Sequence, residues 1–198
     1  MVITWYGKNC FKLQSGDLVL VTDPFEKEKD LTPFRGRADI IIRTITFQAS
    51  GVKRQTSSET FEISYPGEYE VKNVGIKGWP LPNSRSIFLV EMDGFKIILL
   101  GHLANEDEIS ARGGSASGGK NIQEYLEEAD ILFIPAIFAK LVRQLKPSLV
   151  IPTLFEEPKD LKPFLKELGK NEVEPQEKLT ISKKDLSKEK LIIGCLKV

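Results

Sequence analysis

The strongest constraint on the fold is a change of pattern near Gly101. Before it, short apolar or alternating segments follow one another closely, separated by glycine, proline, asparagine and aspartate. After it, segments with helical spacing of apolar residues alternate with short, continuous apolar segments. Strands followed by alternating helices and strands predict two packed sheets with helices outside them. We therefore expect an α+β fold, a four-layer αββα sandwich, in a single domain over residues 1–198.

The first half predicts two meanders, one buried strand and one hairpin. The first three strands form one meander, and the segments between Thr60 and Trp79 form the other. Ile40-Ile41-Ile42 indicates a strand covered on both faces, and Asp93-Gly94 indicates a tight hairpin turn. The expected strands are Val2–Tyr6, Cys10–Leu13, Leu18–Thr22, Ala38–Thr44, Thr60–Ser64, Tyr69–Lys72, Val74–Trp79, Ser86–Glu91 and Phe95–Leu100.

The second half predicts helices at Ile122–Ala129, Ala136–Leu145 and Asp160–Leu168, with strands at Ile131–Pro135, Ser148–Pro152, Lys178–Ile181 and Lys190–Leu196. A glycine- and serine-rich segment, 111–120, precedes the first helix. Such a segment could bind phosphate through its amides, but Asn121 follows Lys120, so the Gly-x-x-x-x-Gly-Lys-Ser/Thr spacing is missing. We expect a surface loop there.

The balanced charge of the chain bears on its possible partners. Lysine plus arginine and aspartate plus glutamate both number 28, and the net charge is +0. A nucleic-acid partner is therefore not expected, although one lysine cluster leaves RNA or an acidic partner as an alternative. We expect no secretory signal, no membrane association and a cytoplasmic location. The cluster consists of Lys183, Lys184, Lys188 and Lys190.

The two cysteines, Cys10 and Cys195, lie in apolar segments near opposite ends of the sequence. In a reducing compartment, buried thiols behave as small hydrophobic side chains. We expect both to be free and buried, with a disulfide as the alternative.

Five short motifs stand out along the chain: Gly7-Lys8-Asn9-Cys10-Phe11, Asp23-Pro24-Phe25, Pro66-Gly67-Glu68-Tyr69-Glu70-Val71, Ile134-Pro135 and Ile151-Pro152. Together they resemble the metallo-β-lactamase superfamily, in particular its compact branch of ascorbate-phosphate-lactonase-like, Zn-dependent hydrolases. The resemblance covers nearly the whole chain and implies a sandwich fold, a zinc pair, hydrolase chemistry and frequent homo-oligomers.

The resemblance also locates the family's metal ligands, which follow a threonine in a His-x-His-x-Asp-His turn. Thr44 matches that threonine, but mostly apolar residues follow it. Isoleucine, phenylalanine, alanine and leucine carry no donor atom for a metal, and serine is a weak neutral ligand. The former metal-ligand positions are Ile45, Phe47, Ala49, Ser50, His102 in place of the bridging aspartate, and Leu154 in place of the last histidine.

Two further family histidines are also absent, because Lys8 replaces one and Leu81–Ser84 covers the place of the other. The whole chain has one histidine, whereas a binuclear zinc site needs several imidazoles. We therefore expect no metal, no cofactor and no metallohydrolase activity. A single weakly bound ion at His102 with nearby carboxylates, Asp23, Glu106 or Asp107, is a minor alternative.

His102, Asp23 and Lys8 remain the candidate catalytic residues. A lone histidine at a strand end could act as a general base oriented by an aspartate, but no nucleophile motif accompanies it. Phe47, Leu154 and Phe155 could instead close the former pocket or form an apolar contact surface, and we favour the closed pocket.

The main hypothesis is a non-catalytic protein of this fold that binds, scaffolds or forms oligomers, through an unknown protein partner or self-association. The alternative is a hydrolase of the same fold that cleaves an ester, lactone or phosphodiester at a non-standard site around His102.

Overall fold

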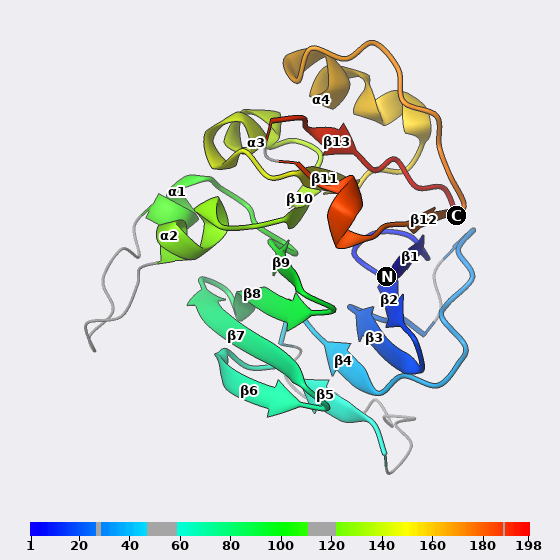
Figure 1. Ribbon diagram of the computed structural model, residues 1–198, viewed down its shortest axis with the longest axis vertical. Coiled ribbons are helices and arrows are strands. Elements are labelled where there is room, and N and C mark those ends of the chain that lie inside the picture. The colour runs from blue at the N-terminus through cyan, green and yellow to red at the C-terminus, as the bar shows by residue number, and fades with distance from the viewer. Residues whose placement is uncertain (27–28, 47–58, 111–121, 188) are drawn as a thin grey trace.

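The structure is a computed structural model that describes residues 1–26, 29–46, 59–110, 122–187 and 189–198. Two mixed β-sheets pack face to face (Figure 1). The six-stranded sheet has the order β12-β1-β2-β3-β4-β5, and the seven-stranded sheet has the order β13-β11-β10-β9-β8-β7-β6.

The strands of the six-stranded sheet are β1 (Val2–Trp5), β2 (Phe11–Ser15), β3 (Leu18–Thr22), β4 (Ile40–Ile42), β5 (Phe61–Ile63) and β12 (Lys178–Thr180). Those of the seven-stranded sheet are β6 (Gly67–Val71), β7 (Val74–Leu81), β8 (Arg85–Met92), β9 (Phe95–Leu99), β10 (Ile131–Pro135), β11 (Leu149–Thr153) and β13 (Ile192–Ile193).

The helices lie beside β9, β10 and β11 (Figure 1). They are α1 (Asp107–Ser110), α2 (Ile122–Glu127), α3 (Ala139–Leu145) and α4 (Lys162–Glu167), with 3-10 turns η1 (Pro158–Leu161) and η2 (Lys183–Asp185). On the outer face of the six-stranded sheet, the connection from β3 to β4 supplies Phe25 and Phe34, which pack on Cys10, Val21 and Ala38. The expected α+β sandwich is confirmed.

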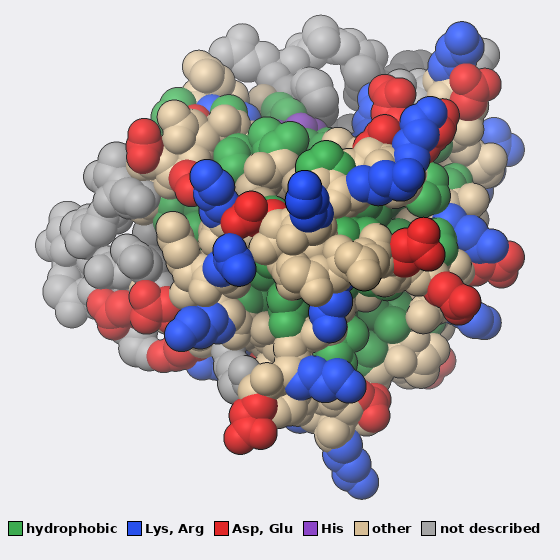
Figure 2. Space-filling view, turned by 90° about the horizontal axis from the view of Figure 1, so that it is seen from above, with side chains coloured by type: hydrophobic (Ala, Val, Ile, Leu, Met, Phe, Trp, Pro, Cys, Tyr) green, Lys and Arg blue, Asp and Glu red, His purple; other side chains and the backbone are tan. Residues whose placement is uncertain are grey.

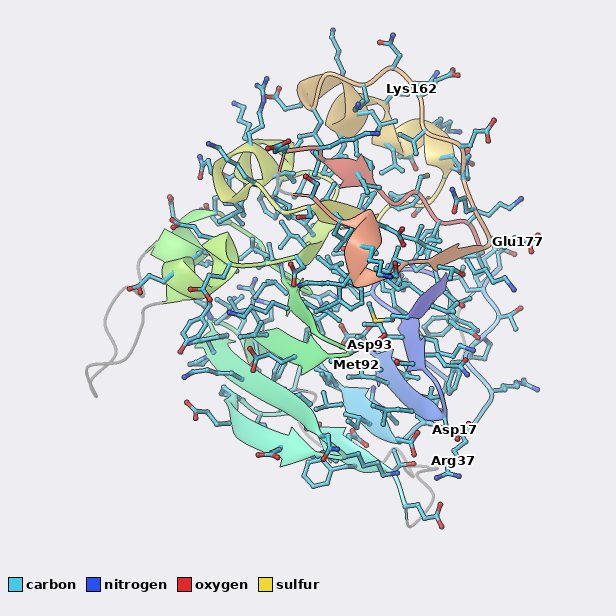
Figure 3. All side chains as sticks on the ribbon, viewed as in Figure 1. Asp17, Arg37, Met92, Asp93, Lys162 and Glu177 are labelled. Atoms are coloured by element: carbon cyan, nitrogen blue, oxygen red, sulfur yellow. The ribbon has the colours of Figure 1, made fainter. Side chains whose placement is uncertain are left out.

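Several local predictions are confirmed as well. Strands β1, β2 and β3 form an antiparallel meander. Strands β8 and β9 form the predicted hairpin, in which Met92 pairs with Phe95. Asp93 and Gly94 both have positive φ, 54° and 74°, as a type I′ turn requires. The hairpin tip lies beside the N-terminus, where the Met1 amino group forms a 3.2 Å ion pair with Asp93 (Figure 3).

The second predicted meander is wrong. Strand β5 pairs in parallel with β4 in the six-stranded sheet, whereas β6 and β7 pair in the other sheet. The chain passes from one sheet to the other at Ser64–Pro66, where proline cannot donate a ladder hydrogen bond. A strand pattern identifies each segment, but it does not specify the sheet that a segment joins.

Apolar side chains from both sheets and from the helices form one continuous core. Cys10 and Cys195 are both free and buried, as predicted. Burial raises the pKa of the Cys10 thiol to about 12, so this cysteine stays protonated and unreactive at neutral pH. Within the described ranges, we find no helix with the length and apolar character needed to cross a membrane.

Asp39 links the two sheets at the amino end of β4. Its buried carboxylate accepts hydrogen bonds from the Val19 amide at 2.9 Å and from Lys72 Nζ at 2.5 Å. Lys72 lies in the turn between β6 and β7, so the contact joins the seven-stranded sheet to the start of β4. The hydrogen bond from Lys72 lowers the pKa of Asp39.

We predict that Asp39→Asn lowers the free energy of unfolding at pH 7 by about 2 kcal/mol, the usual value of a hydrogen bond to a charged group. The pKa of Asp39 is depressed, so its stabilisation is present above the unfolded value near 3.8 and is lost as the pH falls through the folded value. Urea unfolding from pH 7 to pH 3 should show the variant and the wild type converging in acid. Asp17→Asn, at the exposed β2–β3 turn, is the control (Figure 3). An equal loss at both positions would contradict the role of Asp39.

Candidate functional site

Four of the positions singled out in the sequence follow the carboxyl ends of strands. Asp23 follows β3, Thr44 follows β4, His102 follows β9 and Leu154 follows β11. Strands β3 and β4 are parallel, as are β9, β10 and β11, so each group ends at one edge of its sheet. Sites in sheets of this kind commonly form at such edges.

A chain of hydrogen bonds joins Asp23, Thr44 and His102 across the two sheets. The Thr44 amide donates to Asp23 Oδ1 at 2.7 Å, and the Thr44 hydroxyl donates to Asp23 Oδ2 at 2.5 Å. Thr44 Oγ1 also lies 2.9 Å from His102 Nδ1. The hydroxyl has one hydrogen, so it must accept from Nδ1–H while it donates to Asp23. His102 Nε2 is then left as a hydrogen-bond acceptor.

Burial shifts the pKa values of both Asp23 and His102. Burial raises the pKa of Asp23 to about 6, against the opposing effect of its hydrogen bonds from Thr44. Burial also lowers the pKa of His102, and the positive charges of Arg85 and Lys8 lower it further. His102 is therefore neutral at pH 7, so no strong ion pair forms across its 3.9 Å separation from Asp23.

The backbone after β4 also pairs with the start of β8. The Ser86 amide donates to the Thr44 carbonyl, and the Thr46 amide donates to the Ser84 carbonyl, both at 2.8 Å. Gly101 packs directly on Thr44 and has φ +53°. A Cβ at Gly101 would overlap the Thr44 side chain, so only glycine fits there.

Arg85 holds the segment that carries His102. Its guanidinium donates to the His102 carbonyl at 2.8 Å and to the Pro82 carbonyl at 2.9 Å. It also forms two hydrogen bonds with the Glu108 carboxylate, at 3.0 and 2.6 Å. Arg85 lowers the pKa of Glu108. Sequence reasoning missed Arg85, because an arginine at a strand end gives no signal of burial.

Arg43 has a similar role in the other sheet, and it too was missed. It donates to the Pro24 carbonyl at 2.9 Å and to Glu62 at 2.7 Å, which fixes the turn after Asp23.

A cavity of about 10 Å³ lies beneath the hydrogen-bonded chain, and Asn9, Asp23, Thr44 and Thr153 contribute to its lining. Nδ2 of Asn9 and Oγ1 of Thr153 are buried and have no partner among the described residues. This volume matches about one water molecule. This cavity is therefore too small for an organic substrate.

Of the three candidate catalytic residues, the structure brings Asp23 and His102 together. Asp23 and His102 lie 3.9 Å apart, and Lys8 is close enough for its charge to lower the pKa of His102. Lys8 is exposed, and its carbonyl accepts a 3.0 Å hydrogen bond from Trp5 Nε1.

The other predicted positions differ in how far they are buried. Leu154 does not pack into a closed pocket, because it is 39% exposed and has a left-handed φ of 56°. Phe155 is buried, and its ring stacks on Trp5 at 4.6 Å. Ile45 is half-buried and forms a β-bridge with Arg85.

Phe47, Ala49, Ser50, the segment 111–120 and Lys188 lie outside the described residues. Of the lysine cluster, Lys183 forms a 2.5 Å ion pair with Asp130 and lies over the Phe95 ring. Among the residues that the structure describes, no group of three or more histidine, cysteine, aspartate and glutamate side chains could hold a metal ion.

Comparison with known proteins identifies a family whose sequence profile matches this chain. The profile of the β-lactamase superfamily domain matches residues 2–154. Among curated protein sequences, none matches this chain significantly.

Solved structures share the fold. A candidate Zn-dependent hydrolase of the metallo-β-lactamase superfamily from Thermotoga maritima is 23% identical over the full length of both chains, with a TM-score of 0.71. A candidate metal-dependent hydrolase from Veillonella parvula is 10% identical, over 91% of this chain and 99% of its own, with a TM-score of 0.62. An isothiocyanate hydrolase from Delia radicum gut bacteria is 11% identical, over 98% and 96%, with a TM-score of 0.58.

We predict that Gly101→Ala lowers the free energy of unfolding by about 3 kcal/mol, because it combines a strained φ with overlap against Thr44. Gly16→Ala is the matched control, since Gly16 has φ +57° but no atom within 4 Å of the added Cβ. It should lose only about 1 kcal/mol. Denaturant unfolding measures both, and equal losses would show that the Thr44 contact does not limit residue 101.

A second prediction concerns the pH dependence of Asp23. Its folded pKa of about 6 exceeds the unfolded value of 3.8, so the protonated form contributes stability below pH 3.8 that is lost as the pH rises through 6. Stability of the wild type relative to Asp23→Asn should therefore fall by up to about 3 kcal/mol between pH 3.5 and 7.5. Urea unfolding at several pH values tests this. A constant difference between the two proteins would contradict a raised pKa.

Proposed function

Because this chain belongs to the β-lactamase superfamily and has the metallo-β-lactamase fold, we propose that it is a non-catalytic member that binds, scaffolds or forms oligomers. One feature of the sequence carries the proposal: at the positions that the family resemblance assigns to metal ligands, this chain holds residues that cannot coordinate a zinc pair. The residues are Ile45, Phe47, Ala49, Ser50, His102 and Leu154.

The polar groups at the strand ends also support the proposal, because they are engaged with one another. Asp23 accepts two hydrogen bonds from Thr44, and His102 Nδ1 donates to the same threonine hydroxyl. A metal would have to compete with these contacts, and it would find one imidazole and one carboxylate. Catalytic zinc sites use three protein ligands per ion. The residues present therefore do not fit the metal centre of the family.

Arg85 supports the same proposal because it stabilises the backbone near His102. Its hydrogen bonds to the His102 and Pro82 carbonyls hold two strand connections together, with Glu108 balancing its charge. A buried guanidinium needs such partners, because a buried charge without them is strongly destabilising. Arg85 thus holds the connection after β7 and the connection after β9, which carries His102.

A second candidate is a hydrolase that uses His102 without a metal. The observation in its favour is the Asp23–Thr44–His102 chain, which orients a neutral imidazole with Nε2 available as a base. His102 is 29% exposed, so solvent reaches it. The 10 Å³ cavity is lined by Asp23 and Thr44 but not by His102, so an organic substrate would have to reach His102 from its solvent-exposed side.

One experiment separates the two candidates. Zinc and manganese are titrated into the purified chain by calorimetry, and phosphodiesters, lactones and β-lactams are then assayed with and without each metal. The non-catalytic proposal predicts no stoichiometric binding and no turnover. Stoichiometric binding with metal-dependent turnover would overturn it.

His102→Ala completes the test, with Asp17→Asn as the surface control. Metal-free turnover that His102→Ala lowers about a hundredfold or more, and that Asp17→Asn leaves unchanged, would establish the hydrolase alternative.

A further inference from the structure

A groove of about 900 Å³ lies next to the site formed by Asp23, Thr44 and His102, which we call the strand-end site. The connections after β9, β10 and β11 form its walls together with helix α4. Strand β10 lies between β9 and β11 in the sheet, so the connection after β10 lies between the other two along this edge. The volume is in the range of sites that bind ligands or peptide side chains.

The central part of the groove exposes apolar side chains. Ile137, in the connection after β10, is 78% exposed, and Leu154, in the connection after β11, is 39% exposed. Both line the groove, where the buried rings of Phe138 and Phe164 also contribute. Figure 2 views the molecule from the side on which α4 lies in Figure 1 and shows hydrophobic side chains at the surface among charged ones. Exposed apolar side chains gathered in a groove mark an interaction site.

The conformation of Leu154 strengthens this interpretation. Its φ of 56° is rare for a bulky residue, and the conformation costs roughly 1 kcal/mol or more. The strain is not offset by burial, because the side chain remains exposed in the groove. A strained residue that presents an apolar side chain to solvent is typical of binding surfaces rather than of the packed core.

Carboxylates lie on both sides of the apolar centre. Glu106 and Asp107 belong to the segment after β9, and Glu156 follows β11. None of these three forms an ion pair within the described part of the chain. The lining also includes Asp160 and Glu167, which have partners of their own, and one basic residue, Lys140.

This excess of negative charge is local, because the chain as a whole has net charge +0. The strand order places acidic segments on either side of the connection that carries Ile137. A partner that matches this arrangement carries apolar side chains between positive charges.

We propose that this groove binds a segment of another protein in which two or three apolar side chains are flanked on both sides by lysine or arginine. The proposal rests on the non-catalytic binding role proposed above and names the chemistry of the partner. Apolar contacts with Ile137 and Leu154 supply affinity, and Glu106, Asp107 and Glu156 steer the basic flanks.

The test uses the full chain and three fluorescent synthetic peptides, each measured by fluorescence anisotropy at about 0.15 M salt. The first has a Leu-Phe-Leu centre between lysine pairs. The second replaces the centre with Ser-Gly-Ser, and the third replaces the lysines with glutamates. The proposal predicts saturable binding of the first peptide, with the other two at least tenfold weaker. Equal binding of the first two peptides would overturn it, since charge alone would then explain the affinity.

Variants locate the binding surface. Ile137→Ser should weaken binding of the first peptide about tenfold, the usual effect of losing one buried apolar side chain. The double variant Glu106→Gln/Asp107→Asn should weaken it about fivefold at low salt and less at 0.5 M salt. Asp17→Asn/Glu70→Gln removes two exposed carboxylates at the other end of the molecule and should have no effect. Unchanged binding by Ile137→Ser would overturn the proposal.

Sedimentation of the same proteins tests a second copy of this chain as the occupant. If the wild type is an oligomer that Ile137→Ser dissociates, and the first peptide does not bind, the groove is a self-association surface and the proposed partner is wrong. These outcomes are independent of the metal and substrate assays, so failure of the groove proposal leaves the non-catalytic role standing, and metal-dependent turnover overturns that role without changing the peptide result.

Discussion

The contact between Thr44 and the opposite sheet determines the arrangement of the strand-end site. Apolar packing between two sheets is strong but has little directionality, so it does not by itself fix how the two edges align. The amide of Ser86 and the ring of His102, both from the seven-stranded sheet, meet the carbonyl and hydroxyl of Thr44. Gly101 permits this close approach because it has no side chain. These directional bonds place Asp23 and His102 together.

The same segment connects this site with the apolar groove. After His102 the chain runs to Glu108, whose carboxylate binds Arg85 and also accepts a 3.2 Å hydrogen bond from the Ala104 amide. Arg85 and Glu108 thus fix the start of the segment that bears Glu106 on the groove wall. A rigid wall lowers the entropy cost of binding, because less of the chain must be ordered when a partner arrives. The Arg85–Glu108 pair therefore supports both the site at His102 and one wall of the groove.

Sequence patterns predicted most strands and three helices because local periodicity reflects which side chains are buried. The error at β5 has a physical cause. A segment such as Phe61–Ile63 has the same pattern in either sheet, and the path of the chain through Pro66 decides which strand it pairs with. The short helix Asp107–Ser110 was also missed, because four residues are too few to show a helical period.

At the site, the sequence alone determined the chemistry that is available: one histidine in the chain, and apolar residues such as Ile45 and Leu154 at positions that the family resemblance assigns to ligands. Tertiary structure decided how the remaining groups are used. The Thr44 hydroxyl lies between Asp23 and His102, residues 79 positions apart, and Leu154 faces solvent instead of the site. Such contacts depend on how two sheets meet and on individual φ angles, and no local pattern in the sequence encodes either.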